Sequence, residues 1–320
     1  MVNGPQVGFK LPNCGGILCE PGWARPQTIL RLAGLAREMD YDSLWLHDHL
    51  LTPRELRGLP EPRFYEPMVV MAALAGAVPD MTIGVATLIA PLREPVLLYK
   101  QMVALEHFFP GRTIVGIGVG QYESEFEAFG TPTYRQRGRI TNEYLELMQA
   151  LSRQEAATFT GTQRSVTDAA TYPKLVFGTQ PPIWIGGNSE AAVDRARRYG
   201  SGWICSSALT PADVRARLAH LAADSPRLDV ALTATVANAD IGGTREGAAG
   251  THKHSSVIVG SADTVAARLG DYVDAGIGHL LLTFRSPDLD ALQAQLRWFA
   301  ADVRPQLDQP QRNGNSRGEA

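Results

Sequence analysis

The amino-acid sequence predicts an α/β fold, a (β/α)8 TIM barrel formed by a single domain over residues 1–308. Short apolar runs alternate with helical patterns from end to end, and such alternation with short connections favours parallel strands. Eight strand–helix pairs in 320 residues fit this barrel at its upper size range. A doubly wound sheet is the alternative, but it would usually place a glycine-rich phosphate turn after its first strand. Here the first strand runs into Pro12-Asn13-Cys14-Gly15-Gly16, and no helix follows immediately.

Each predicted strand is a short apolar run bounded by turn residues. These runs occupy residues 6–10, 43–47, 82–88, 113–119, 183–185, 202–205, 230–236 and 279–284. Each predicted helix carries apolar residues at helical spacing, as at Ile29, Leu32, Ala33 and Ala36 in the first. The helices occupy residues 26–39, 67–78, 96–108, 137–151, 189–198, 211–223, 261–275 and 289–304.

Two insertions interrupt this alternation. Residues 156–180, after the fourth helix, are predicted to form a small β excursion. Residues 238–254, after the seventh strand, are rich in Gly, Ala and Thr and include His252 and His254. This second insertion is either a lid over the barrel mouth or a structureless surface segment. The polar tail over residues 309–320 is predicted to be disordered.

Composition and charge narrow the class of protein. A net charge of −3 with no long block of like charge argues against a nucleic-acid partner. No uncharged run approaches the roughly 18 residues that a membrane helix needs, and the amino terminus lacks the segments of a signal peptide. We therefore expect a cytoplasmic protein without a membrane partner. Cys14, Cys19 and Cys205 indicate neither a disulfide framework nor a metal site, because no second Cys/His pair has ligand spacing.

The junction after the fifth predicted strand resembles a seat for an anion. An apolar run ends at Gly186 and Gly187, which are followed by Asn188, Ser189 and a helical pattern. Backbone N–H groups at the start of a helix bind phosphate, and glycines let a ligand approach the backbone closely. A tight strand-to-helix turn without a ligand is the alternative.

Polar side chains gather where the second predicted strand ends. The segment Trp45-Leu46-His47-Asp48-His49 places Trp45, His47 and His49 on one face if the strand stays regular. In this barrel the active site lies at the carboxyl ends of the strands, so these side chains are predicted to line a pocket, with at least one histidine contacting a ligand. The alternative is a structural histidine, with Asp48 capping the next segment.

Glycines at alternate positions follow the fourth predicted strand, in Gly116-Ile117-Gly118-Val119-Gly120. They strip one strand face of side chains and leave room for a flat ring system, although packing of neighbouring strands would also explain them. With a phosphate seat and few nucleophiles, this pattern favours a cofactor that brings its own reactivity, such as a flavin.

Taken together, these motifs resemble the bacterial luciferase-like family of flavin- and deazaflavin-dependent oxidoreductases. The chain is most similar to the branch that uses coenzyme F420, because Asp48-His49 follows the second strand. The resemblance rests on Tyr41-Asp42-Ser43-Leu44-Trp45, Leu92-Arg93-Glu94-Pro95, Gly116-Ile117-Gly118-Val119-Gly120, Glu125-Phe126-Glu127-Ala128-Phe129-Gly130, residues 181–189 and Val259-Gly260-Ser261.

The resemblance implies roles for particular residues around a ring held in the barrel mouth. His49 would transfer a proton, with Asp48 beside it. Thr87 would lie beside the ring, near a strained peptide bond that many members have in the third strand. The cofactor would be held by Gly118, Gly120, Gly186, Gly187, Asn188, Ser189, Gly260 and Ser261. His47, Gln121 and Trp45 would face the substrate; sugar-phosphate dehydrogenases of the family have a carboxylate where this chain has Gln121, which argues against that reaction.

The resemblance also implies a function and a partner. The expected function is hydride transfer between coenzyme F420 and a small organic substrate, by a homodimer. An FMN-dependent monooxygenase that uses O2 and a separate flavin reductase is the alternative. A flavin-binding carrier barrel without catalysis is the non-enzymatic alternative.

Overall fold

The computed structural model describes residues 4–13, 24–58, 63–131, 133–175, 182–219, 228–241 and 257–308. Cys14, Cys19, His252, His254 and the tail over residues 309–320 lie outside the described residues. Among the described helices, none is long and apolar enough to cross a membrane.

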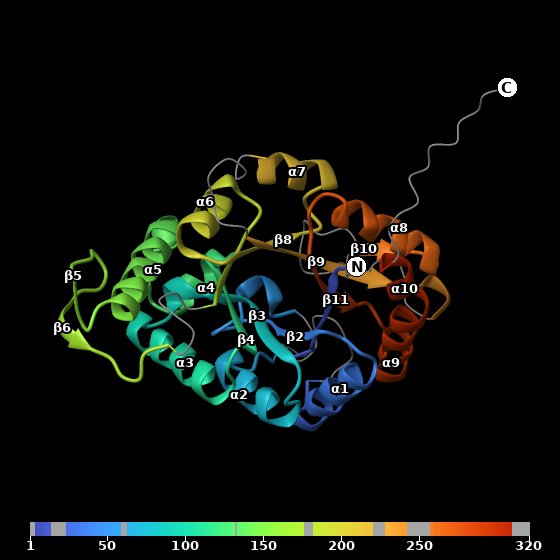
Figure 1. The fold of residues 1–320 in the computed structure, drawn as a ribbon, viewed down its shortest axis with the longest axis horizontal. Helices are drawn as coiled ribbons and strands as arrows, with labels where there is room; N and C mark the ends of the chain where they lie inside the picture. The colour runs from blue at the N-terminus through green and yellow to red at the C-terminus, as the bar shows by residue number, and fades with distance from the viewer. Residues whose placement is uncertain are drawn as a thin grey trace.

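In the described part of the chain, eight parallel strands close into a barrel with helices around it (Figure 1). The sheet order is β9-β11-β1-β2-β3-β4-β7-β8, and a parallel pairing of β8 with β9 closes it. The bounds are β1 (Gln6–Lys10), β2 (Ser43–Leu46), β3 (Thr82–Ile89), β4 (Thr113–Gly118), β7 (Ile183–Gly186), β8 (Gly202–Ser206), β9 (Asp229–Ala237) and β11 (His279–Phe284). The predicted (β/α)8 barrel is confirmed.

A helix follows each barrel strand and packs on its outer face (Figure 1). These helices are α1 (Pro26–Glu38), α2 (Pro67–Ala77), α3 (Pro95–Phe108), α5 (Arg137–Arg153), α6 (Glu190–Tyr199), α7 (Pro211–Ala219), α8 (Ala262–Val273) and α9 (Leu289–Trp298). A π-helical segment, Phe299–Val303, joins α9 to α10 (Arg304–Leu307). Proline in the first turn and a capping carboxylate start α2 and α3, where Glu66 accepts from Val69 N and Glu94 from Leu97 N.

Two additions accompany the barrel, one inside the first predicted insertion and one just after the second. The hairpin of β5 (Ala156–Phe159) and β6 (Val166–Ala170) confirms the β excursion and projects beside α5 (Figure 1). The strand β10 (Val257–Val259), which the sequence reading missed, pairs in parallel with the end of β9. Most of the second insertion, residues 242–254, lies outside the described residues.

The barrel interior is filled by two tryptophans and smaller apolar side chains. Trp45 and Trp184 pack at 5.5 Å between ring centroids, in one cluster with Ile204, Ala231 and Leu281. Glycines on the neighbouring strands make room for Trp45, because a Cβ on Gly8 would lie 2.6 Å from its indole nitrogen. Trp45 has no exposed surface. The prediction that Trp45 lines the substrate pocket is therefore corrected: the side chain points inward, as expected, but is part of the packed core.

Candidate functional site

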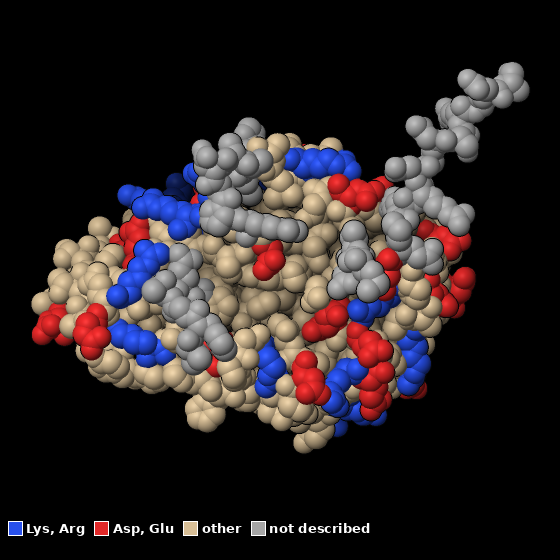
Figure 2. All heavy atoms as spheres, viewed as in Figure 1, with Lys and Arg blue, Asp and Glu red and all other residues tan. Residues whose placement is uncertain are grey.

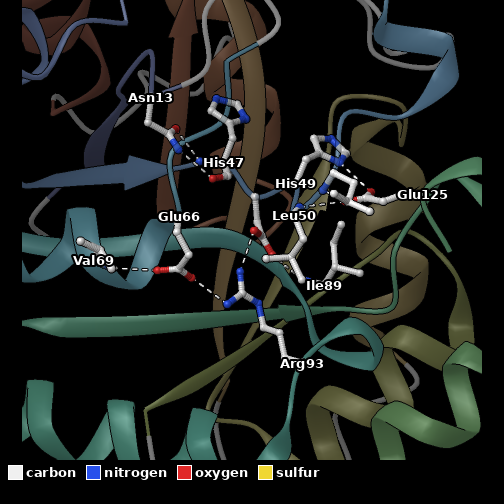
Figure 3. A network of polar contacts seen from close by, with 11 residues as sticks. Asn13, His47, His49, Leu50, Glu66, Val69, Ile89, Arg93 and Glu125 are labelled. Carbon is white, nitrogen blue, oxygen red and sulfur yellow. Dashed lines mark hydrogen bonds and ion pairs between the residues drawn. The ribbon is translucent and has the colours of Figure 1, made fainter. Parts of the chain in front are cut away.

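The candidate site lies at the carboxyl ends of β2, β3 and β4, where polar side chains from different segments meet (Figure 3). Strand ends on this side of a (β/α)8 barrel carry the catalytic groups in characterised enzymes of the fold. A short helix, α4 (Glu123–Ala128), follows β4 and supplies an acidic side chain to the site.

His49 forms a close pair with the buried carboxylate of Glu125. The His49 Nδ1 atom lies 2.8 Å from Glu125 Oε2, and the other carboxylate oxygen accepts from Leu50 N at 2.9 Å (Figure 3). Glu125 is fully buried, whereas the His49 side chain is 13% exposed. An ionised carboxylate only accepts hydrogen bonds, so this contact requires the hydrogen on Nδ1 and leaves Nε2 as the ring nitrogen able to exchange a proton. Sequence reasoning did not predict a role for Glu125.

Aromatic side chains flank the His49 ring. Phe64 meets it edge-on at 4.8 Å between centroids, and Tyr122 lies at 5.7 Å. With Glu125 they fix the orientation of the imidazole, which is the requirement for a proton-transfer group.

Asp48 contacts a different partner from His49, and these contacts favour a positioning role; the catalytic role predicted for it stays a prediction. Its buried carboxylate accepts from Arg93 at 2.8 Å and from Ile89 N at 2.8 Å, which ties the end of β2 to the end of β3. Arg93 also donates to Glu66 at 2.7 Å (Figure 3). Burial raises the pKa of Asp48, and the Arg93 charge opposes that effect. Asp48 and His49 lie in the irregular segment after β2, and their side chains contact different partners, Arg93 and Glu125.

The backbone of His47 is held by two hydrogen bonds to the side chain of Asn13. His47 N donates to Asn13 Oδ1 at 2.8 Å, and Asn13 Nδ2 donates to the His47 carbonyl at 2.8 Å (Figure 3). The fully buried Asn13 thereby joins the segment after β1 to the end of β2. The His47 side chain is half-buried, two positions beyond Trp45.

Thr87 occupies the space that the strand glycines leave. The peptide bond between Ala86 and Thr87 is cis, at the position implied by the family resemblance. A Cβ on Gly118 would collide with Thr87 Oγ1, and a Cβ on Gly186 would lie 2.5 Å from Thr87 Cγ2. The space beside Gly118 therefore holds Thr87, which favours the packing alternative, and a contact of Gly118 with a ring stays a prediction. Gly120 adopts a positive φ of 84° and lies against Phe126.

The glycine junction after β7 is a hydrogen-bonded turn at the start of α6. Gly187 N donates to the Ile204 carbonyl at 3.0 Å, so this amide is already used within the fold. Asn188 exchanges hydrogen bonds with Ser206, at 2.8 and 3.0 Å, and Ser189 Oγ caps α6 by accepting from Ala192 N. These contacts favour the tight-turn reading for Gly187 and Asn188.

A cation that sequence reasoning missed lies beside this junction. Arg217, on α7, donates through Nε to the Asn188 carbonyl at 2.9 Å. The groups here that suit a phosphate are therefore the start of α6 and the Arg217 guanidinium.

The remaining predicted residues lie at two other turns. Gly260 N donates to the Ala237 carbonyl at 3.2 Å, and Ser261 caps α8 by accepting from Thr264 N. Gln121 is exposed after β4, and its carbonyl accepts from the Tyr134 hydroxyl at 2.8 Å. Within the described ranges, no cluster of His, Cys, Asp or Glu is placed to hold a metal ion.

A closed (β/α)8 barrel with an oriented histidine and an arginine beside the start of α6 at its strand ends belongs to the class of barrel proteins whose functional groups lie at the carboxyl ends of the strands. Within that class, the sequence profile of the luciferase-like monooxygenase family matches residues 6–249. The chain belongs to this family.

Relatives and solved structures extend the comparison. An F420-dependent glucose-6-phosphate dehydrogenase from Kineococcus radiotolerans is 30% identical over 186 residues, which are 57% of this chain and 53% of that protein. The chain thus spans about half the length of the curated relatives it matches. An F420-dependent secondary alcohol dehydrogenase in complex with an F420-acetone adduct superposes with a TM-score of 0.77 at 18% identity, over 95% of this chain and 99% of that one. Monooxygenase RslO1 from Streptomyces bottropensis superposes with a TM-score of 0.74 at 19% identity, over 94% of this chain and 99% of that one.

Proposed function

We propose that this protein is an F420-dependent oxidoreductase that transfers a hydride between the deazaflavin and a small organic substrate. The observation that carries the proposal is the His49–Glu125 pair, a single oriented proton-transfer group at the barrel mouth. The F420-dependent relatives support the choice of cofactor.

The residues of the mouth fit such a cofactor. Thr87 is half-buried at the end of β3 and would face the ring, while the start of α6, Ser261 and Arg217 would hold the acidic tail. A bound deazaflavin supplies a carbon that accepts or donates a hydride. His49 Nε2 then takes the proton of a substrate hydroxyl when a carbon–hydrogen bond is oxidised, and returns it in the reverse direction. Glu125 keeps Nε2 directed at the substrate and stabilises the protonated ring.

An FMN-dependent monooxygenase is the second candidate, supported by the family and by the likeness to RslO1. It would consume O2 and require a separate flavin reductase. The Phe64 and Tyr122 rings around His49 would help to exclude water, as that chemistry needs.

We also propose a homodimer formed through α2 and α3. The α2 sequence PMVVMAALAGA carries no charge on any face, although Val69 is 66% exposed. On α3, Leu97 and Phe108 are exposed too, beside the exposed Lys100. The lower edge of Figure 2, where Figure 1 shows α2 and α3, carries mostly uncharged side chains. A helix that is apolar all round is usually buried, so a second copy of this chain is the occupant we propose.

Titration of the purified protein with F420 and with FMN, followed by absorbance and fluorescence, tests the proposal. We expect binding of F420, and F420-linked turnover of a secondary alcohol that falls about a hundredfold or more in His49→Gln. The exposed His107→Gln on α3 is the matched control. FMN binding without F420 binding would favour the monooxygenase, and full activity of His49→Gln would favour a carrier barrel.

A further inference from the structure

Lys10 places a positive charge inside the barrel, at the carboxyl end of β1. Gly8 faces the interior cluster, since a Cβ there would touch Trp45, and Lys10 follows two residues later on the same strand face. The Lys10 residue is only 8% exposed, an uncommon burial for a lysine.

The Lys10 ammonium reaches the segment proposed to contact the cofactor ring. Its Nζ donates to the Ala86 carbonyl at 3.4 Å, which places the charge one residue before Thr87. In the barrel Lys10 pairs with Trp45 of β2, and Trp45 pairs with Gly84 of β3. The lysine side chain therefore extends past β2 to β3 above the layer formed by Trp45 and Trp184.

The side chains around Lys10 strengthen the electrostatic interaction of its ammonium group with a bound ring. The inward positions beyond the tryptophan layer hold small or hydroxyl-bearing side chains, namely Ala86, Gly118, Gly186, Ser206, Thr233, Thr235 and Thr283, with His47 beyond Trp45. Charges interact more strongly in such a partly dehydrated site than in water.

We propose that the Lys10 ammonium stabilises the negative charge that the cofactor ring gains when it accepts a hydride. The inference rests on the proposed F420-dependent function. A hydride brings two electrons and one proton, so the reduced ring carries one more negative charge, while the substrate proton goes to His49. A nearby cation then favours the reduced over the oxidised cofactor and raises the midpoint potential of the bound couple.

The test compares the affinities of the whole protein for oxidised and reduced F420 in the wild type and in Lys10→Met, which keeps most of the length of the side chain without its charge. We expect the ratio of the reduced to the oxidised dissociation constant to rise about tenfold. For a two-electron couple this ratio lowers the bound midpoint potential by about 30 mV. A merely structural role would weaken both forms equally.

Two control variants and two outcomes distinguish a failure of the Lys10 inference from a failure of the proposed F420-dependent function. Lys100→Met removes the same charge from the exposed face of α3 and should leave the ratio unchanged. Lys10→Gln serves for the comparison if Lys10→Met unfolds. An unchanged ratio in a folded Lys10 variant that binds F420 overturns the inference alone, whereas a wild type that binds neither form overturns the proposed function.

Discussion

The His49 imidazole and the Glu125 carboxylate, 76 residues apart in the chain, lie 2.8 Å apart at the barrel mouth. This contact joins the segment after β2 to the helix that follows β4, and β3 lies between these two strands in the sheet. Since Glu125 also accepts from the backbone of Leu50 and Leu51, it is held in place independently of the histidine. The pair therefore sets both the direction and the tautomer of the His49 ring.

Replacing Glu125 by glutamine should lower kcat about a hundredfold. The amide oxygen can still accept from Leu50 and Leu51, but the amide nitrogen then faces His49 Nδ1 as a donor. The hydrogen of the ring moves to Nε2, which can no longer accept a proton from the substrate. Steady-state kinetics should show the loss mainly in kcat.

Glu127→Gln is the matched control for Glu125→Gln. It lies on the same helix, but its carboxylate is exposed and pairs with Arg54 at 3.2 Å. We expect its kcat to stay within about twofold of the wild type. Equal rates for both variants would remove Glu125 from the mechanism.

The contact between α5 and the β5–β6 hairpin should weaken in acid. Glu143 accepts from Thr162 N, Gln163 N and Arg164 N at 2.7–2.9 Å. Partial burial acts to raise the pKa of Glu143, but these hydrogen bonds outweigh it and hold the pKa below its usual 4.5. A carboxyl whose pKa is lowered by folding stabilises the fold above pH 4.5, and this contribution is lost as the pH falls through the lower, folded value.

Limited proteolysis within the hairpin between roughly pH 3 and 7 measures this effect. Glu143→Gln should be cleaved faster at neutral pH and should lose the additional acid sensitivity of the wild type. Glu38→Gln, at an exposed position of α1, is the control. Identical pH profiles for the wild type and Glu143→Gln would contradict the assignment.

A charge on the outer face of α2 should dissociate the proposed dimer. Val69→Glu places a carboxylate on the exposed face of the uncharged helix α2, where burial without a partner is costly. Light scattering should report a dimer for the wild type and a monomer for the variant. Leu30→Glu, at an exposed leucine on α1, should remain dimeric. A monomeric wild type would exclude this interface.

The barrel could be predicted from the sequence because its strands are short apolar runs and each is followed by a helix with an apolar face. The three-residue strand β10 could not, because three residues carry no period. The alternation of side chains also predicted that Trp45 points inward. It could not tell how deep the indole lies, since that depends on Gly8 and Gly84 of the two neighbouring strands.

The sequence predicted where the candidate site lies, but not which of its side chains contact one another. His49 could be predicted because it follows a strand. Asp48 lies next to His49 in the sequence, but its carboxylate contacts Arg93, and the partner of His49 is another residue. The partner, Glu125, comes from a different βα unit and has no local signal that links it to His49. The same reason explains why the sequence did not predict the roles of Arg93, Arg217 and Lys10. These roles depend on contacts between segments that are distant in the chain.

Gly118 and Thr87 should be energetically coupled. Gly118→Ala places a methyl group against Thr87 Oγ1, and overpacking of this kind costs about 1–3 kcal/mol of unfolding free energy. Thr87→Ala removes that oxygen and leaves Cβ at 3.3 Å from the new methyl group, so the double variant should recover most of the loss. Denaturant unfolding of the four proteins gives the coupling energy, which we expect to exceed about 0.5 kcal/mol. Gly34→Ala, which meets no atom within 4 Å, should be neutral or slightly stabilising. Additive effects of Gly118→Ala and Thr87→Ala would show that the glycine is kept for another reason than room for Thr87.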